Sequence, residues 1–325
     1  MVLVLTRNHI ESLVSMQDAI QAVEQAFLEI AKGRALYPTR LYLDLPKYNG
    51  GILVSLGYLE DLKELGIKIA SSYPDNKNKG LFTVSSLIIL NDPETGYPEA
   101  VLEGNYITSI KTGAVGAIAV KYLARKNSEI LLIIGAGEQA KAQLSAIVHV
   151  TNIKKVMVFS RTRISMERFI NEMRRKVNLD YEIVENLEKA IGKADIIVTA
   201  TTSKIPVISG EHVNKGTHIN GIGSFTPDAA EIDTISFEKA GKVFVDNYEA
   251  KNVGDIRFAL EKGAIKETDI YHLADVVSGK MKGRNNENDI TIFKSVGGAP
   301  YDLAVSWLVY NRAKKEGIGI DISIY

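Results

Sequence analysis

The sequence contains no cysteine, which excludes disulfide bonds, thiolate nucleophiles and cysteine metal ligands. It also lacks an excess of either charge, because 39 lysines and arginines balance 39 aspartates and glutamates. A neutral chain does not present the broad basic surface that binding to nucleic acid or to a membrane usually needs. We therefore expect neither nucleic acid nor a membrane as a partner.

Long hydrophobic runs are absent too. No apolar stretch reaches the ~18 residues that span a bilayer, and the short run at residues 2–5 is followed at once by charged side chains, unlike a signal peptide. These features predict a soluble, cytoplasmic protein. Histidine is sparse, and its five copies lack the spacing of metal ligands: His9, His149, His212, His218 and His272. We predict no metal site.

The 325 residues, 46% of them hydrophobic, suffice for two domains that each bury a core. The first third shows a helical pattern over residues 15–32 and then a series of short strands with turns between them. The predicted strands are 41–43, 51–56, 66–71 and 81–90. This part therefore predicts an α+β arrangement built on an antiparallel or mixed sheet.

After a long predicted helix at 105–124, the pattern changes to strands that alternate with helices. The predicted strands are 130–134, 156–160, 195–200, 217–222 and 243–246, and helices such as 138–150 and 162–176 lie between them. Such alternation indicates parallel strands joined by crossover helices, so we predict an α/β fold with a doubly wound parallel sheet. One more helix is predicted over 301–315.

A glycine-rich turn follows the first strand of this second part and precedes a helix. It reads Gly135, Ala136, Gly137, Glu138, Gln139 and Ala140, which is the G-x-G-x-x-A pattern of dinucleotide-binding folds. Gly135 permits the tight turn, Gly137 lets a pyrophosphate approach the backbone, and Ala140 lets helix and strand pack closely. The amides at the helix start favour phosphate oxygens. We predict a Rossmann-type site for a nicotinamide dinucleotide.

The end of the next strand bears on the choice between NAD and NADP. An acidic residue there would accept a hydrogen bond from the adenosine ribose, but the chain has Ser160, Arg161, Thr162 and Arg163. Arginine with small hydroxyls suits a 2′-phosphate, so NADP(H) is favoured and NAD(H) remains possible. A later strand ends in Ala200, Thr201, Thr202 and Ser203, which we predict to line the nicotinamide side.

Several segments in order resemble the ornithine cyclodeaminase/mu-crystallin family, which includes archaeal-type alanine dehydrogenases and ketimine reductases. The matching segments are 66–68, 93–96, 107–114, 135–140, 199–203 and 293–297. The resemblance implies a substrate-binding and dimerisation domain, residues 1–112 with 302–325, and a Rossmann domain, residues 113–301. It implies a homodimer whose last helix returns to the first domain.

The resemblance also implies which residues form the sites. It places Arg40, Lys68 and Lys111 in the substrate pocket, where Arg40 and Lys111 would bind a carboxylate and Lys68 would act as the catalytic residue. Lys68 can move a proton only if burial or neighbouring cations lower its pKa. Further cofactor contacts are predicted at the ends of two later strands: Gly223, Ser224, Phe225, Ser295 and Gly297.

Three departures from the family pattern bear on the substrate. Members usually have arginine at the position of Lys111. Ornithine-cyclising members have an aspartate where this chain has Phe225, and an acid in the strand that here reads 51–56 without one. A buried ammonium without an acidic partner is costly, so these losses argue against ornithine. They favour a short or apolar amino acid such as alanine, or a cyclic imine.

Three functions follow from these observations. The preferred one is an NAD(P)-dependent oxidoreductase that acts on the C–N bond of a small α-amino or imino acid. The second is an ornithine cyclodeaminase, which releases ammonia with no net change in NADH. The third is a non-catalytic, mu-crystallin-like protein that binds NADP, because a nucleotide site alone does not prove turnover.

Overall fold

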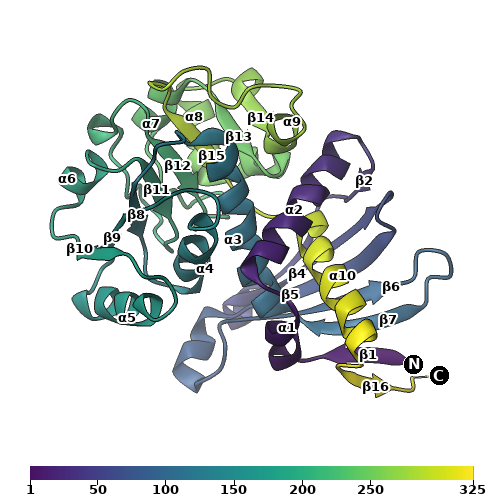
Figure 1. Cartoon of the computed structure of the whole chain (residues 1–325). Helices are drawn as coiled ribbons and strands as arrows, with labels where there is room; N and C mark the ends of the chain where they lie inside the picture. The colour runs from purple at the N-terminus through teal and green to yellow at the C-terminus, as the bar shows by residue number, and fades with distance from the viewer. Residues whose placement is uncertain (325) are drawn as a thin grey trace. The chain divides into compact units, whose positions relative to one another are not determined.

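The computed structural model describes residues 1–324 and divides into two compact units (Figure 1). Unit 1 comprises Met1–Lys111 and the residues from Gly298 onward, and unit 2 comprises Thr112–Gly297. The chain therefore leaves unit 1 after residue 111, where the predicted first domain ended at 112. It re-enters unit 1 at residue 298, where the predicted re-entry was at 302. None of the helices in the described part of the chain is long and apolar enough to cross a membrane.

Three helices lie within unit 1: α1 (Arg7–Leu13), α2 (Met16–Ala31) and α10 (Ala299–Glu316). Helix α2 begins where Ser15 Oγ accepts from the amide of Asp18 while the Asp18 carboxylate accepts from the amide of Ser15. Its stripe of Ala19, Val23 and Phe27 is fully buried. Helix α10 follows unit 2 in the sequence and packs on α2 (Figure 1).

The described part of unit 1 contains an eight-stranded mixed sheet. Its order is β16 (Ile320–Ile322), β1 (Val2–Leu5), β7 (Pro98–Glu103), β6 (Val84–Asn91), β5 (Glu64–Ser72), β4 (Gly50–Leu59) and β2 (Ala35–Leu36), with β3 (Leu41–Leu45) also paired to β4. Strands β1 and β7 are parallel and the other pairs are antiparallel. The predicted strand at 81–90 begins only at Val84, because Leu81 and Phe82 precede it in an exposed turn.

The two faces of this sheet differ in what covers them. Residues opposite one another on neighbouring strands share a face, and Ser55, Lys68 and Ile88 form one such row. That face is covered by α10, since a side chain added at Gly66, on the same face, would meet Leu303. The opposite row includes Leu41, which is 68% exposed.

Helix α3 (Gly104–Leu123) contains the boundary between the units. The Glu103 carboxylate accepts from the amides of Asn105 and Tyr106, which satisfies two donors of the first turn. Ile107, Ala114 and Ile118 of this helix are fully buried, and the charged Lys111 is only 4% exposed, so the helix differs from an amphipathic surface helix.

Unit 2 contains an all-parallel sheet, as predicted. Across its described residues the order is β10 (Asp180–Ile183), β9 (Lys155–Phe159), β8 (Ile130–Ile134), β11 (Ile196–Thr199), β12 (His218–Gly221), β15 (Thr291–Lys294), β13 (Val243–Val245) and β14 (Ile270–His272). The chain runs outward from β8 to β10 and then continues from β11 on the other side of β8. The switch point between β8 and β11 is where doubly wound folds bind ligands.

The helices of unit 2 are α4 (Glu138–Ile147), α5 (Arg163–Arg174), α6 (Leu187–Ile191), α7 (Thr234–Ala240), α8 (Gly254–Glu261) and α9 (Leu273–Val277). They connect the parallel strands, and apolar side chains of strands and helices together form a buried core. Strand β15 follows α9 in the sequence but inserts between β12 and β13. Its carboxyl end therefore lies beside that of β12.

Candidate active site

Three charged side chains that lie far apart in the sequence of unit 1 form a buried cluster. Lys68 on β5 donates to Asp302 Oδ1 at 3.0 Å, and Lys111 Nζ of α3 lies 3.6 Å from Asp302 Oδ2. The side chains of Lys68, Lys111 and Asp302 are 11%, 6% and 4% exposed. The structure therefore brings together the predicted Lys68 and Lys111 and adds a carboxylate between them.

The electrostatics of this cluster favour a lysine that can exchange its proton. Burial lowers the pKa of Lys68 most, the positive charges of Lys111 and Arg40 lower it further, and only Asp302 opposes them. Burial works to raise the pKa of Asp302, but the two lysines outweigh it and the pKa is lowered. Asp302 is thus held as an anion between two lysines, one of which gives up its proton more easily than usual.

Asp302 is not among the site residues predicted from the sequence. Its position in the first turn of α10 resembles an ordinary acidic helix start, where carboxylates are common. One signal could have indicated that an acid lies nearby: if Lys68 and Lys111 are both buried, they require an acidic partner. The separation of 234 residues between Lys68 and Asp302 hides that partner from any local pattern.

In unit 2, the glycine-rich turn has the backbone that its pattern predicts. Gly135 has a φ of +113°, and a β-carbon there would overlap the carbonyl oxygen of Ala200. Gly137 is the N-cap of α4, and a β-carbon there would meet no atom within 4 Å. Ala140 is fully buried. The turn therefore packs tightly against β11 at Gly135 and leaves open space at Gly137.

Those observations fit a bound dinucleotide. The open space lies at the amino end of α4, which has no side chain capping its amides, and such amides bind phosphate oxygens. In addition, Gln139 Oε1 is buried without a hydrogen-bond partner in the described protein. A buried acceptor of this kind commonly meets a ligand or a water. Gly137, Glu138, Gln139 and Ala140 are thus the residues that would hold the pyrophosphate.

The end of β9 carries the residues predicted to contact the adenosine ribose. Thr162 is the N-cap of α5, and its hydroxyl accepts from the amide of Ser165. Ser165 in turn donates to Ser160 Oγ at 3.0 Å. Arg161 is exposed, whereas Arg163 forms an ion pair with Glu167 at 2.9 Å. Of the two arginines, Arg161 is the better placed to bind an added anion.

Two predicted cofactor loops are joined by a buried carboxylate that the sequence analysis missed. Glu231 Oε1 accepts from the amide and hydroxyl of Thr201, at 2.6 and 2.8 Å. Its Oε2 accepts from Thr199 Oγ1, from the amide of Gly223 and from the amide of Ser224. Glu231 therefore connects the carboxyl ends of the neighbouring strands β11 and β12, of which β11 borders the switch point.

Two more buried acids, Asp255 and Asp246, accept hydrogen bonds from residues predicted to contact the cofactor. The hydroxyl of Ser224 donates to Asp255, which also pairs with the fully buried Lys294 at 2.8 Å. Asp246 accepts from the hydroxyl of Ser295 at 2.6 Å and from the amide of Gly297 at 2.9 Å. The hydroxyls of Ser224 and Ser295 are thus donors within the protein, and both serines fix the shape of their loops.

The loop after β12 is buried at Ser224 and becomes exposed at the next residue. Phe225 is 66% exposed and projects from the protein. Asp228, three residues further on, forms an exposed ion pair with Lys204 at 2.8 Å. Ornithine-cyclising members of the resembled family have an acid at the position of Phe225. In this chain that position holds an exposed phenylalanine, and the nearby Asp228 is exposed as well.

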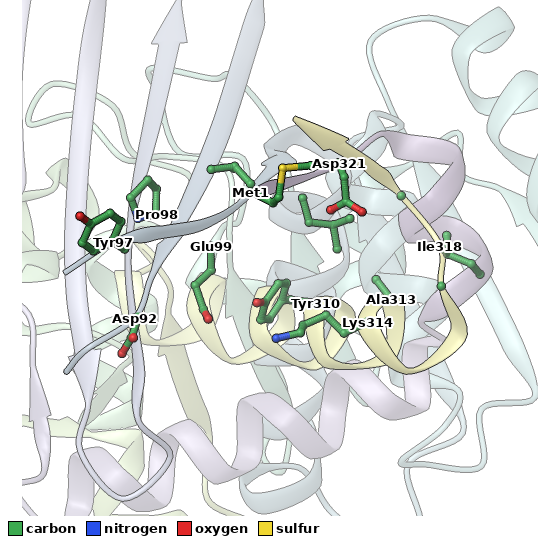
Figure 2. Close-up of a pocket in the computed structure, with 14 residues that line it drawn as sticks. Met1, Asp92, Tyr97, Pro98, Glu99, Tyr310, Ala313, Lys314, Ile318 and Asp321 are labelled. Carbon is green, nitrogen blue, oxygen red and sulfur yellow. The ribbon is translucent and has the colours of Figure 1, made fainter. Parts of the chain in front are cut away.

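A separate cavity of about 520 Å³ lies at another end of unit 1, beside β7, β16 and α10 (Figure 2). Its wall includes the side chains of Asp92, Glu99, Tyr310, Lys314 and Asp321. Of the residues that the structure describes, none with a predicted role in substrate or cofactor binding lines it. The cavity is therefore distinct from the Lys68 cluster.

Comparison with known proteins extends over nearly the whole chain. The family model "Ornithine cyclodeaminase/mu-crystallin family" matches residues 1–317. The alanine dehydrogenase of Archaeoglobus fulgidus is 39% identical over 326 residues, which cover 99% of this chain and 98% of that protein.

Two solved structures are similar in both fold and sequence. Thermococcus litoralis Δ1-pyrroline-2-carboxylate reductase, in complex with NADH and L-proline, superposes with a TM-score of 0.95 at 42% identity, covering 99% of this chain and 100% of that chain. An archaeal alanine dehydrogenase dimer with bound NAD superposes with a TM-score of 0.94 at 39% identity, covering 100% and 99%.

Proposed function

The chain belongs to the ornithine cyclodeaminase/mu-crystallin family, and we propose that it is an NAD(P)-dependent oxidoreductase acting on the C–N bond of a small α-amino or imino acid. The observation that carries this proposal is the buried cluster of Lys68, Lys111 and Asp302 in a chain that also has a dinucleotide-type turn at Gly135. Its similarity to an alanine dehydrogenase and to an imino-acid reductase supports the same reaction class.

The chemistry can be divided among the residues of the cluster. Arg40 and Lys111 bind the substrate carboxylate, for which cations with directed donors are suited. Lys68 donates a proton to the nitrogen as an imine is reduced and takes it back in the reverse reaction, a role that its lowered pKa favours. Asp302 positions Lys68 and Lys111. The dinucleotide, when bound, supplies or accepts the hydride at the carbon.

We expect a substrate with a small uncharged side chain. Two candidates follow from the similar proteins: Δ1-pyrroline-2-carboxylate, reduced to proline, and pyruvate with ammonia, converted to alanine. Strand β4 carries no acidic residue that could pair with a distal ammonium group. A cationic chain end buried beside Lys68 would then lack a partner, which is costly.

The test is a spectrophotometric assay of the purified protein with NADPH or NADH and each of these two substrates. We expect loss of the reduced-nicotinamide absorbance with at least one of them, and no loss with the Lys68→Ala variant. A flat trace with wild-type protein would exclude the proposal. Ammonia release from ornithine without net NADH change would then indicate a cyclodeaminase, and dinucleotide binding without either reaction would indicate a binding protein.

For the cofactor, we propose a preference for NADP(H). The end of β9 offers the exposed Arg161 and no acidic residue in the segment from Ser160 to Arg163, although both similar solved structures bind NAD or NADH. A charge-assisted contact to a 2′-phosphate corresponds to about a tenfold change in the dissociation constant. Arg161→Ala should weaken NADPH binding by about that factor and leave NADH binding unchanged; tighter binding of NADH by wild-type protein would contradict the preference.

We also propose that the chain forms a homodimer through the open face of the unit 1 sheet. Leu41, Val54, Ile69 and Leu87 lie opposite one another in a single row on that face. Leu41, Ile69 and Leu87 are 68%, 40% and 52% exposed. A contiguous apolar surface of this kind usually meets another protein surface, and one of the similar proteins is a dimer.

A further inference from the structure

The fully buried Glu231 carboxylate receives five hydrogen bonds, one from the last residue of β11 and four from the loops that follow β11 and β12. The donors belong to Thr199, Thr201, Gly223 and Ser224, and none of them carries a formal charge. Burial of a carboxylate without a cation is costly unless donors satisfy both oxygens. The contacts at Glu231 meet that condition, because two donors reach Oε1 and three reach Oε2.

Three of the five donors are backbone amides, which cannot rotate away or become acceptors. The amide of Thr201 faces Oε1 at 2.6 Å, and those of Gly223 and Ser224 face Oε2 at 2.7 and 3.1 Å. A glutamine would turn its NH2 group toward at least one amide in either orientation. Only a carboxylate accepts from both sides at once, so an amide side chain cannot replace Glu231 with all of these contacts intact.

The backbone of Glu231 is itself fixed by a second buried acid. Asp255 Oδ1 accepts from the amides of Glu231 and Ile232, at 2.6 and 2.8 Å, while Asp255 Oδ2 pairs with Lys294. Lys294 also donates to Ser224 Oγ at 2.7 Å. Gly223 completes the contact, since a β-carbon there would overlap the backbone of Thr201. The two loops are therefore held at a fixed separation.

We propose that Glu231 is a positioning residue for the dinucleotide, because its buried carboxylate holds together the loops after β11 and β12 that line the nicotinamide end of the site. This inference rests on the proposed function for the identity of the ligand. Glu231 acts through Thr201, Gly223 and Ser224 and does not itself touch the reacting atoms. Its loss widens the separation of the loops and weakens dinucleotide binding.

The test compares Glu231→Gln with a matched control in the same sheet. Asp195 is a carboxylate that accepts from the amides of Glu129 and Ile130, at 2.9 and 3.0 Å, at the opposite, amino end of β8 and β11. Asp195→Asn therefore makes the same carboxylate-to-amide change away from the proposed loops, and it also removes the ion pair that Asp195 forms with Arg125. Titration calorimetry with NADPH and NADH measures binding, and amide hydrogen exchange measures the order of residues 199–203 and 221–225.

We expect Glu231→Gln to raise the dissociation constant of the preferred dinucleotide at least about tenfold and to accelerate exchange in both loops, and Asp195→Asn to change neither. An unchanged dissociation constant in Glu231→Gln, or an equal rise in Asp195→Asn, would overturn the inference. If Glu231→Gln does not fold, Thr201→Val decides, because it removes one side-chain donor; it should weaken binding in the same direction, and unchanged binding would again overturn the inference.

These outcomes separate the inference from the proposed function. Weakened dinucleotide binding in Glu231→Gln, with no turnover of any imino acid by wild-type protein, would support the inference and reject the enzyme proposal. Turnover by wild-type protein, with unaltered dinucleotide binding in Glu231→Gln, would support the enzyme proposal and overturn the inference.

Discussion

At the scale of single residues, the Lys68–Asp302 pair decides how the buried cluster of Lys68, Lys111 and Asp302 responds to pH. Burial and the cations Lys111 and Arg40 lower the pKa of Lys68, so it loses its proton at a lower pH than a free lysine. Asp302 opposes this shift. Because the proposed reduction of an imine uses protonated Lys68 as its proton donor, activity in that direction should be full at lower pH and fall as the pH rises through this pKa.

The first prediction is that Asp302→Asn moves this fall in activity to lower pH. Removing the carboxylate takes away the charge that raises the pKa of Lys68, while Lys111 and Arg40 continue to lower it. The measurement is kcat/KM for imine reduction as a function of pH. Asp195→Asn, in unit 2, should keep the wild-type profile. A fall that stays in place or moves to higher pH in Asp302→Asn would contradict the assignment of Lys68 as proton donor.

The second prediction distinguishes the two glycines of the dinucleotide turn. Gly135→Ala places a β-carbon on the Ala200 carbonyl oxygen at a φ of +113°, so it should lower the free energy of unfolding by about 1–3 kcal/mol from backbone strain alone. Gly137→Ala fills open space at an ordinary φ of −88°. It should leave stability unchanged and weaken dinucleotide binding.

Chemical denaturation and titration calorimetry on both variants check this contrast. Equal destabilisation by the two substitutions would contradict the difference in packing, and unchanged dinucleotide binding in Gly137→Ala would show that the open space at Gly137 is not where a ligand approaches. The residue pattern alone assigned both glycines to the turn, but only the surrounding atoms showed that one is needed for packing and the other for access.

At the scale of elements, a single aspartate joins two helices of unit 1. Asp18 completes the capping box of α2 and also binds Arg312 of α10 through both oxygens, at 2.7 and 2.8 Å. The hydrogen bond from Arg312 lowers the pKa of Asp18 most, followed by that from Ser15. The start of this helix at residue 15 was predicted from the sequence, whereas the partner on α10 is 294 residues away.

The third prediction is that Asp18→Asn lowers the free energy of unfolding by about 1–2 kcal/mol at pH 7, from the lost cap and a partly exposed ion pair. A lowered pKa in the folded state gives stability that is present above the unfolded pKa of about 3.9 and is lost as pH falls through the folded value. The difference between wild type and variant should therefore shrink below about pH 4.

Urea denaturation at pH 7 and at pH 3 measures this effect. The control is Glu11→Gln, which breaks the exposed Arg7–Glu11 pair on α1 and should cost less than about 0.5 kcal/mol. A difference that persists undiminished at the lower pH would contradict the role given to the ionised Asp18.

At the scale of the whole molecule, the sheet of unit 1 leaves one face to be covered. Helices α2 and α10 lie together on one face of this sheet (Figure 1). Helix α10 covers the face that bears Lys68, while the row of Leu41, Ile69 and Leu87 on the other face is exposed. Alternation along a strand makes this possible, because neighbouring residues such as Lys68 and Ile69 point to opposite faces. The same strand can therefore serve the site and an interface.

The fourth prediction is that light scattering finds the wild-type protein at twice its chain mass of 35.7 kDa and Leu87→Glu at the mass of a single chain. A carboxylate buried in an apolar interface is strongly disfavoured. Ile164→Glu, at a 70% exposed apolar residue on α5 of unit 2, is the matched control and should remain a dimer. A dimeric Leu87→Glu protein would exclude this face as the interface.

The sequence alone determined the features that depend on residues close together in the chain. The glycine-rich turn, the alternation of strands and helices in unit 2 and the helix that starts at Ser15 follow from local backbone preferences and from the period of apolar residues. The absence of a suitable acid after β9 was also visible in the sequence, because the position is defined relative to a strand end.

The tertiary structure decided which charged groups meet. Asp302 lies between Lys68 and Lys111, and Glu231 between the loops after β11 and β12, although neither acid stands in a local motif. Their roles arise because buried charges must find partners wherever the chain brings them. The period of apolar residues specifies which face of a strand or helix is buried, but it does not specify which distant side chain lies against that face.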